Sequence, residues 1–143
     1  MQILIDLHGA SLSHIWRWAG QIRTTELTIG VDPAYIYEEL GKLSVDLSGW
    51  LEHGWFSAHE LAMRAHHRLV QIHPFKDVNG RITRLYADLL VASLTEQPAC
   101  VVDWAPANAD KRTYIRALQH ADQAAGDVRP LMALLPLKPI YFA

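Results

Sequence analysis

Two helical patterns separated by one short loop constrain the fold of this chain more than any other feature. A capping box that begins at Ser57 starts the first pattern, and apolar residues follow it at helical spacing. Pro74 disfavours helical backbone at the residue before it, so this helix must end by His73. The second pattern begins around Gly80 and must end before Pro98. We therefore predict two consecutive helices joined by a short loop.

Most of the remaining chain is also predicted to be helical. Asp32 followed by proline is typical of a helix start and predicts a helix over residues 33–52. Asn108 is expected to cap a further helix that ends near Gly126. Residues 21–31 are the exception, because their apolar residues mix with three threonines and a glycine, which suits a short β-hairpin. The predicted class is all-α with one such hairpin.

Size and composition limit the organisation and the partners of the protein. The 143 residues fit a single domain, which we assign to residues 1–143. The net charge of −2 argues against bulk attraction to nucleic acid, so any phosphate site must be local. No apolar run approaches membrane-spanning length, and the amino terminus does not resemble a signal peptide. Because Cys100 is the single cysteine, nothing indicates an oxidising compartment, and we expect a cytoplasmic protein with no membrane partner.

The loop and the helix start after it combine features of a phosphate site. Asn79 and Gly80 close the turn at a helix N-terminus, where unpaired backbone N–H groups and the helix dipole favour an anion. Arg81 and Arg84 are three residues apart, so both guanidinium groups can project to one side of the first turn and bind phosphate oxygens. We predict a phosphate cradle here.

Two further residues of the loop can carry chemistry. His73 is placed to face the cradle, and a neutral imidazole can accept a hydroxyl proton near pH 7. Asp77 is the one carboxylate inside the loop and could hold a magnesium ion that also binds nucleotide phosphates. Taken singly, His73 could be a helix cap, Asp77 a turn residue and the arginines a solvated surface. The ordered set favours a catalytic site over these separate interpretations.

The segment from His73 to Arg84 resembles the signature of the Fic family, H-P-F-x-D/E-G-N-G-R-x-x-R. It matches at every defined position except one, where Val78 replaces the first glycine. Residues 16–23 are similar to the family's W-A-G-x-x-R stretch, residues 65–69 resemble the usual lead-in to the motif, and residues 114–118 resemble its Y-x-x-A-L helix. The resemblance covers roughly residues 8 to 130.

This resemblance implies a Fic fold, a helical bundle with a β-hairpin flap near the active site. It implies a protein adenylyltransferase, an enzyme that transfers AMP from ATP to a Ser, Thr or Tyr hydroxyl of a target protein. His73 would be the catalytic base and Asp77 the Mg²⁺ ligand. The ATP phosphates would be bound by Asn79, Gly80, Arg81 and Arg84. The target would pair edge-on with the flap, whose residues are Arg23, Thr24, Thr25, Glu26, Leu27, Thr28 and Ile29.

Two alternatives to AMP transfer remain open. One is a Fic relative that moves another group, such as UMP, phosphocholine or a γ-phosphate. The other is a catalytically weak Fic fold that serves as a binding module, because Val78 places a β-branched side chain where the family has glycine.

Many family members carry an inhibitory helix with the pattern S/T-x-x-x-E-G/N, whose glutamate pairs with the second arginine of the motif, here Arg84. Ser48 and Glu52 have this spacing, but His53 follows where glycine or asparagine belongs. The expected source of inhibition is therefore a separate, antitoxin-like protein or a segment outside this chain.

Overall fold

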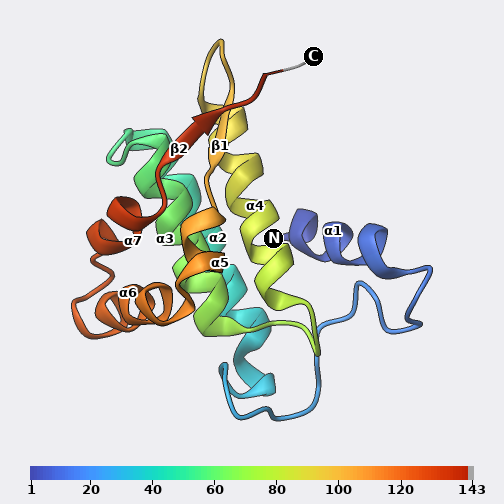
Figure 1. The fold of residues 1–143 in the computed structure, drawn as a ribbon. Coiled ribbons are helices and arrows are strands. Elements are labelled where there is room, and N and C mark those ends of the chain that lie inside the picture. Colours follow the sequence, from blue (N-terminus) through green and yellow to red (C-terminus); the bar gives the residue numbers. More distant parts are fainter. Residues whose placement is uncertain (142–143) are drawn as a thin grey trace.

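The computed structural model describes residues 1–141, and most of them are helical (Figure 1). Helices α2 (Ile36–His53), α3 (Ala58–Ile72) and α4 (Asn79–Leu94) form the centre, and α1 (Gln2–Leu12) packs against α4. The C-terminal part contains α5 (Ala105–Ala109), α6 (Lys111–Gln123) and α7 (Arg129–Leu134). α3 contacts α2, α4 and α7, so the helix that leads into the loop lies in the middle of the fold.

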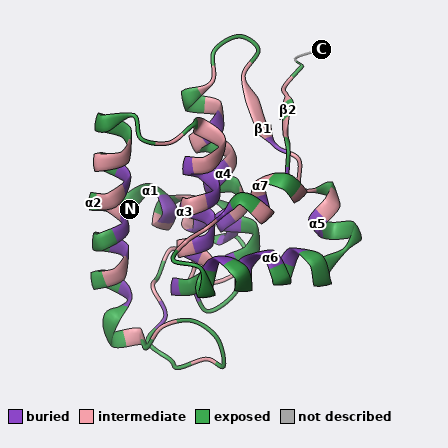
Figure 2. Cartoon of the chain, turned by 90° about the vertical axis from the view of Figure 1, so that its left-hand side faces the viewer, coloured by how far each residue is buried: buried purple, intermediate pink, exposed green. Residues whose placement is uncertain are grey.

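The predicted start and end of α3 are confirmed. The hydroxyl of Ser57 accepts the backbone N–H of Glu60 at 3.2 Å, and His73 follows the last helical residue in the left-handed conformation. Eight residues of α3 are buried, so most faces of the helix lie inside the core, as Figure 2 shows in purple. This burial fixes the axis of α3, and the axis determines where His73 begins the loop.

The predicted helix over residues 33–52 is present in two parts. Pro33–Tyr35 forms a 3₁₀ turn, η1, with the Asp32 carboxylate accepting the N–H of Ala34 at 2.8 Å, and α2 continues from Ile36. α2 ends at His53, and Gly54 caps it with a φ of 60°, which is left-handed and therefore suits glycine. The outer face of α2 is exposed, whereas its inner face buries Ile36, Leu40, Leu43 and Leu47 against the core.

The predicted β-hairpin is wrong. Residues 21–31 all lie in the described part of the chain and contain no strand. The backbone N–H of Arg23 donates to the carbonyl of Pro74 at 3.0 Å, and that of Val31 donates to the carbonyl of Ile72 at 3.3 Å. The segment is thus bonded to the end of α3 and to the loop after it, where a hairpin would pair its two arms with each other.

The strands that do form lie elsewhere. β1 (Cys100–Val102) and β2 (Leu137–Pro139) make a two-stranded antiparallel sheet, in which Val101 pairs with Lys138. β1 packs against α4. The sheet therefore closes the C-terminal part of the chain over α4, on the opposite side from α1 in Figure 1.

The predicted cap at Asn108 is also wrong. Asn108 lies inside α5, which starts early because Pro106 favours the first helical turn. The cap of α6 is Asp110, whose carboxylate accepts the N–H of Thr113 at 3.1 Å. Gly126 lies just beyond α6, as expected, with a φ of 81° and its N–H bonded to the carbonyl of Ala121 at 2.9 Å.

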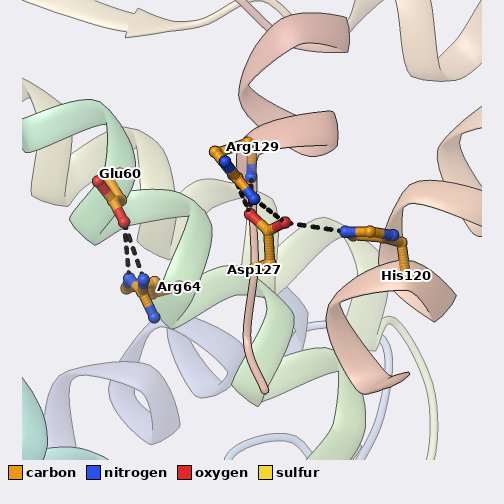
Figure 3. Close-up of polar contacts among 5 residues, drawn as sticks. All are labelled: Glu60, Arg64, His120, Asp127 and Arg129. Atoms are coloured by element: carbon orange, nitrogen blue, oxygen red, sulfur yellow. Dashed lines mark hydrogen bonds and ion pairs between the residues drawn. The ribbon is translucent and has the colours of Figure 1, made fainter. Parts of the chain in front are cut away.

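A polar cluster fixes the turn between α6 and α7 (Figure 3). The carboxylate of Asp127 accepts two bonds from the Arg129 guanidinium, each 2.8 Å long, and faces His120 Nε2 at 2.9 Å. The Arg129 guanidinium, with His120, holds the pKa of the Asp127 carboxyl below its usual value. On the neighbouring α3, Arg64 pairs with Glu60 at 2.9 Å. Among residues 1–141, no helix has both the length and the apolar character that crossing a bilayer requires.

Candidate active site

The loop between α3 and α4 borders an open cavity of about 570 Å³. One wall belongs to the loop and the first turn of α4. The opposite wall comes from the end of α1 and the residues after it. The lining residues are Leu12, Ile15, Trp16, His73, Lys76, Asp77, Val78, Asn79, Gly80 and Arg81. The structure thus brings together five of the predicted site residues: His73, Asp77, Asn79, Gly80 and Arg81.

His73 is held by its backbone on both sides. Its N–H donates to the carbonyl of Leu69 at 3.0 Å, which ends α3, and its own carbonyl accepts Nε of Arg23 at 2.6 Å. Its φ of 51° is in the left-handed region, which is uncommon for a residue other than glycine. The side chain is therefore directed by a constrained backbone and is half-buried at the cavity.

The surroundings of His73 favour its neutral form. Burial lowers the pKa of the imidazole below its usual value, and the positive charge of Arg23 lowers it further. The Asp77 carboxylate opposes both effects. A neutral ring at pH 7 has a free lone pair and can accept a proton.

The loop is braced from inside by Asn79. Its side-chain Oδ1 accepts the N–H of Phe75 at 2.9 Å, and its Nδ2 donates to the carbonyl of Phe75 at 2.7 Å. Asn79 is 4% exposed and Phe75 is fully buried, so this contact anchors the loop in the core. The side chain of Asn79 is consequently committed to the loop, which leaves its backbone N–H as the group that can face an anion.

The N-terminus of α4 opens onto the cavity without a side-chain cap. Val78 occupies the cap position with φ 63° and ψ 18°, so the chain places valine in the left-handed conformation that glycine adopts readily. Gly80 is different: its backbone is right-handed helical, and a Cβ there would meet no protein atom within 4 Å. Gly80 also lines the cavity.

Asp77 offers a donor set that fits a hard cation. Its side chain is exposed at the cavity wall, and Oδ1 accepts the N–H of Val78 at 2.7 Å. Mg²⁺ in nucleotide sites commonly uses one or two carboxylates, with phosphate oxygens and waters as the other ligands. One exposed carboxylate beside an anion-binding helix start satisfies that requirement.

The two arginines of the motif lie in different surroundings. Arg81 is exposed and lines the cavity. Arg84 is not part of the cavity wall, because its Nη1 donates to Asn108 Oδ1 at 2.8 Å and its guanidinium lies 5.1 Å from the ring centre of Trp104 and 5.2 Å from that of Tyr114. The expected pair on one side of the helix is thus split between the cavity and the α5–α6 region.

Residues 21–31 meet the loop at His73. The Arg23 side chain is 4% exposed and donates to the carbonyls of His73, Thr25, Val31 and Ile72. Gly30 has a φ of 95°, and a Cβ there would lie 2.6 Å from both the Cβ of His73 and Nη2 of Arg23. Of the predicted flap residues, Arg23 is therefore turned inward, Leu27 is half-buried, and the others are exposed: Thr24, Thr25, Glu26, Thr28 and Ile29.

Sequence reasoning missed several residues of the site. The α1 helix and its buried His8 were not predicted, although Leu4, His8 and Leu12 recur at a spacing of four and all three are buried. Asn108 was assigned to a cap, yet its side chain holds Arg84. No local pattern indicates this second role, because it depends on how α5 packs beside α4.

With this geometry in view, the chain belongs to the Fic/DOC family, whose model matches residues 1–91. Among characterised relatives, it is 29% identical over 141 residues to the protein adenylyltransferase Fic of Culex quinquefasciatus, a match that covers 92% of this chain and 26% of the relative. It is 42% identical over 64 residues to a uridine 5'-monophosphate transferase of Xanthomonas campestris, covering 39% and 11% of the two chains. The chain thus spans about a quarter of the length of the Culex relative.

Solved structures support the same fold. A Fic domain containing signaling protein from Bacteroides thetaiotaomicron superposes with a TM-score of 0.74 at 22% identity, covering 92% of this chain and 56% of that one. The BepC protein of Bartonella tribocorum, solved with bound AMPPNP, gives a TM-score of 0.70 at 21% identity and covers 98% and 75%. The predicted mostly helical Fic fold is confirmed.

Proposed function

We propose that this chain is a protein adenylyltransferase that transfers AMP from ATP to the hydroxyl of a Ser, Thr or Tyr side chain in a target protein. The observation that carries the proposal is the shared cavity wall of His73 and the uncapped N-terminus of α4. A base and an anion site meet there, and nucleotidyl transfer to a hydroxyl needs both. The adenylyltransferase names of the relatives give the same reaction class.

His73 acts first on the target hydroxyl. Its neutral imidazole accepts the hydroxyl proton as the oxygen attacks the α-phosphorus of ATP. The new O–P bond forms while the bond from the α-phosphorus to the bridging oxygen of the β-phosphate breaks. The products are the AMP-modified target and pyrophosphate, and the proton remains on His73 until solvent removes it.

The start of α4 and the arginines hold the phosphates. The backbone N–H groups of Asn79 and Gly80 stabilise the charge that develops on the α-phosphate, because they point out of the helix at its positive end. Arg81 neutralises the leaving pyrophosphate from the cavity wall. Arg84 joins it if its guanidinium exchanges the bond to Asn108 for a phosphate oxygen. A Mg²⁺ ion held by Asp77 would supply further charge neutralisation to the phosphates.

The target lies along residues 24–29, next to His73. Within the described chain, no backbone N–H between residues 24 and 30 donates to another backbone group. An extended target segment can pair with such groups, and main-chain pairing gives register with modest demands on side chains. These backbone N–H groups are available to a target even though residues 21–31 do not form the predicted hairpin.

A second candidate is transfer of UMP. The observation that favours it is the match to the Xanthomonas campestris uridine 5'-monophosphate transferase. The two activities share His73 chemistry and differ in the base of the nucleotide. Incubating the protein and a host lysate with α-labelled ATP or α-labelled UTP separates them, because the label reaches protein from one nucleotide and not from the other.

The partners and location follow from the same proposal. We place the enzyme in the cytoplasm and propose that a separate protein with an S/T-x-x-x-E-G/N motif inhibits it by pairing its glutamate with Arg84.

Because the Arg84 guanidinium would bind both ATP and the inhibitory glutamate, Arg84→Ala should weaken ATP binding about tenfold and abolish inhibition. Calorimetric titration of ATP measures the first effect, and unchanged affinity would remove Arg84 from the site. Asn108→Ala is the matched control, because it frees Arg84 without removing its charge.

A further inference from the structure

His8 connects α1 to the loop that carries the proposed active site. It lies between Leu4 and Leu12 on the buried side of α1 and is fully buried. A polar ring in this position costs free energy unless its nitrogens are hydrogen-bonded. Both are: Nδ1 lies 2.9 Å from the backbone nitrogen of Gly20, and Nε2 lies 3.2 Å from the carbonyl oxygen of Asp77.

These two partners determine the tautomer of the ring. The backbone N–H of Gly20 can only donate, so Nδ1 must be the unprotonated nitrogen. The carbonyl of Asp77 can only accept, so Nε2 must carry the hydrogen. A single neutral form, with the proton on Nε2, satisfies both contacts. Burial lowers the pKa of His8 below its usual value, against the opposing effect of the Asp77 carbonyl and carboxylate, which agrees with a neutral ring.

The ring contacts the loop a second time through its face. It stacks on Phe75 with a centroid distance of 3.9 Å and an interplanar angle of 12°. Phe75 is the residue whose two backbone groups are bound by Asn79. His8 therefore supports the loop from α1 at Phe75 and Asp77, while Asn79 supports it from within.

Gly20 makes this arrangement possible through its left-handed backbone and its close approach to Gly9. Gly20 has a φ of 79°, and a Cβ there would lie 3.2 Å from the Cα of Gly9. The backbones of α1 and residue 20 thus touch, which brings the Gly20 N–H to His8.

We propose that His8 is a positioning residue: its Nε2–H fixes the Asp77 carbonyl and thereby places the Asp77 carboxylate and the start of α4 at the cavity. This proposal rests on the proposed function for its effect on catalysis, but not for its structural content. Misplacing the loop lowers the rate at saturating ATP, because groups aligned for the transition state are displaced. Binding of ATP through the arginines depends less on the same alignment.

Three substitutions separate positioning from packing. His8→Gln keeps an amide N–H near the place of Nε2, His8→Asn keeps an amide oxygen near the place of Nδ1, and His8→Leu keeps neither. We expect kcat within about threefold of wild type for Gln and reduced about tenfold or more for Asn and Leu, with KM for ATP changed less than about threefold in all three. His14→Leu, at an exposed histidine just beyond α1, is the control and should leave kcat unchanged.

If the kcat values of the Gln and Asn variants fall in the opposite order, His8 has a different role. If Asn retains activity and Gln does not, the bond to Gly20 matters and the proposal is overturned. Equal kcat for the wild type and the three His8 variants also overturns the proposal. Circular dichroism and thermal melting show whether each variant folds. If Leu does not fold, the comparison of Gln with Asn decides.

A measurement on the wild-type protein tests the hydrogen bond from His8 to the Asp77 carbonyl without an activity assay. Long-range ¹H–¹⁵N spectra of histidine-labelled protein report the tautomer of each ring, and His8→Gln identifies the signal of His8. We expect an Nε2–H ring with unprotonated Nδ1. An Nδ1–H or charged ring at neutral pH contradicts the proposal. If the tautomer is as expected and no nucleotide is transferred, the proposed function fails, while the proposed contact of His8 with the loop stands.

Discussion

The loop over residues 73–80 and the segment over residues 21–31 meet at His73, but they are held in different ways. The backbone of the loop is bound by side chains along its length. Asn79 binds both groups of Phe75 and Asp77 binds the N–H of Val78 from within, and His8 and Arg23 bind loop carbonyls from outside. The segment is fixed at its ends by Arg23 and Val31, and its middle is largely exposed. The difference indicates that the geometry of the proposed catalytic loop is built in, whereas the proposed target surface keeps backbone N–H groups that donate to no other backbone group.

The largest effect is expected from the loop. His73→Ala removes the proposed base and leaves the start of α4 in place, so transfer should fall by about 10²–10⁴ while ATP affinity stays within about threefold. Labelled-AMP transfer and calorimetric ATP binding measure the two quantities. Transfer within tenfold of wild type would exclude His73 as the base.

The pH dependence of the wild-type rate tests the same residue. The pKa of His73 is lowered by burial and by Arg23, so the neutral form that the proposed mechanism requires persists to a lower pH than for an ordinary histidine. The rate should be constant near neutrality and fall with acid at a midpoint below the ordinary value of about 6.5. Initial rates with saturating ATP and target measure it. A midpoint above 6.5 contradicts the assigned environment.

The next effect concerns the junction of the two regions. Gly30→Ala adds a methyl group that would lie 2.6 Å from the His73 Cβ, at a φ of 95° that alanine rarely adopts. Displacing His73 should lower kcat by about 10- to 100-fold. Gly41→Ala is the control, because a Cβ there meets no atom within 4 Å and helix propensity improves. Equal kcat for the two variants would show that segment and loop are independent.

A smaller change, in the opposite direction, is expected at Val78. Glycine relieves the left-handed strain of valine, so Val78→Gly should raise the transfer rate several-fold, by about 3- to 10-fold, corresponding to roughly 1 kcal/mol. Gly80→Val is the counterpart: the fold has room for the side chain, but Gly80 lines the cavity, so we expect the added methyl groups to obstruct the ligand and nearly eliminate transfer. Both are compared at saturating ATP with one target. A Val78→Gly enzyme no faster than wild type would show that valine is tolerated in a competent loop.

The smallest effect is expected in the exposed part of the segment. If the target pairs with backbone groups, Thr28→Ala should change KM for the target less than about threefold and leave kcat unaltered. Steady-state kinetics with a purified target decides this. A tenfold rise in KM would mean that the Thr28 side chain carries recognition, and the comparison between the two regions would lose its basis.

The sequence predicted the elements whose causes are local. The Ser57 cap, the end of α3 before Pro74 and the start of α4 after the loop all depend on residues within a few positions of one another. The assignment of residues 1–143 to one domain and the catalytic roles of the site residues stay predictions.

The tertiary structure decided whatever depends on a distant partner. Residues 21–31 have the composition of a hairpin, yet the carbonyls at the end of α3 and the buried Arg23 take up the bonds that hold them. Arg84 is turned from the cavity by Asn108, 24 residues later in the chain, and His8 reaches Asp77 across 69 residues. A helix cap or a proline acts on backbone groups within a few residues of it in the sequence. Hydrogen bonds between distant segments exist only after packing has brought them together, so this sequence alone could indicate candidate site residues but not the distant groups that hold them.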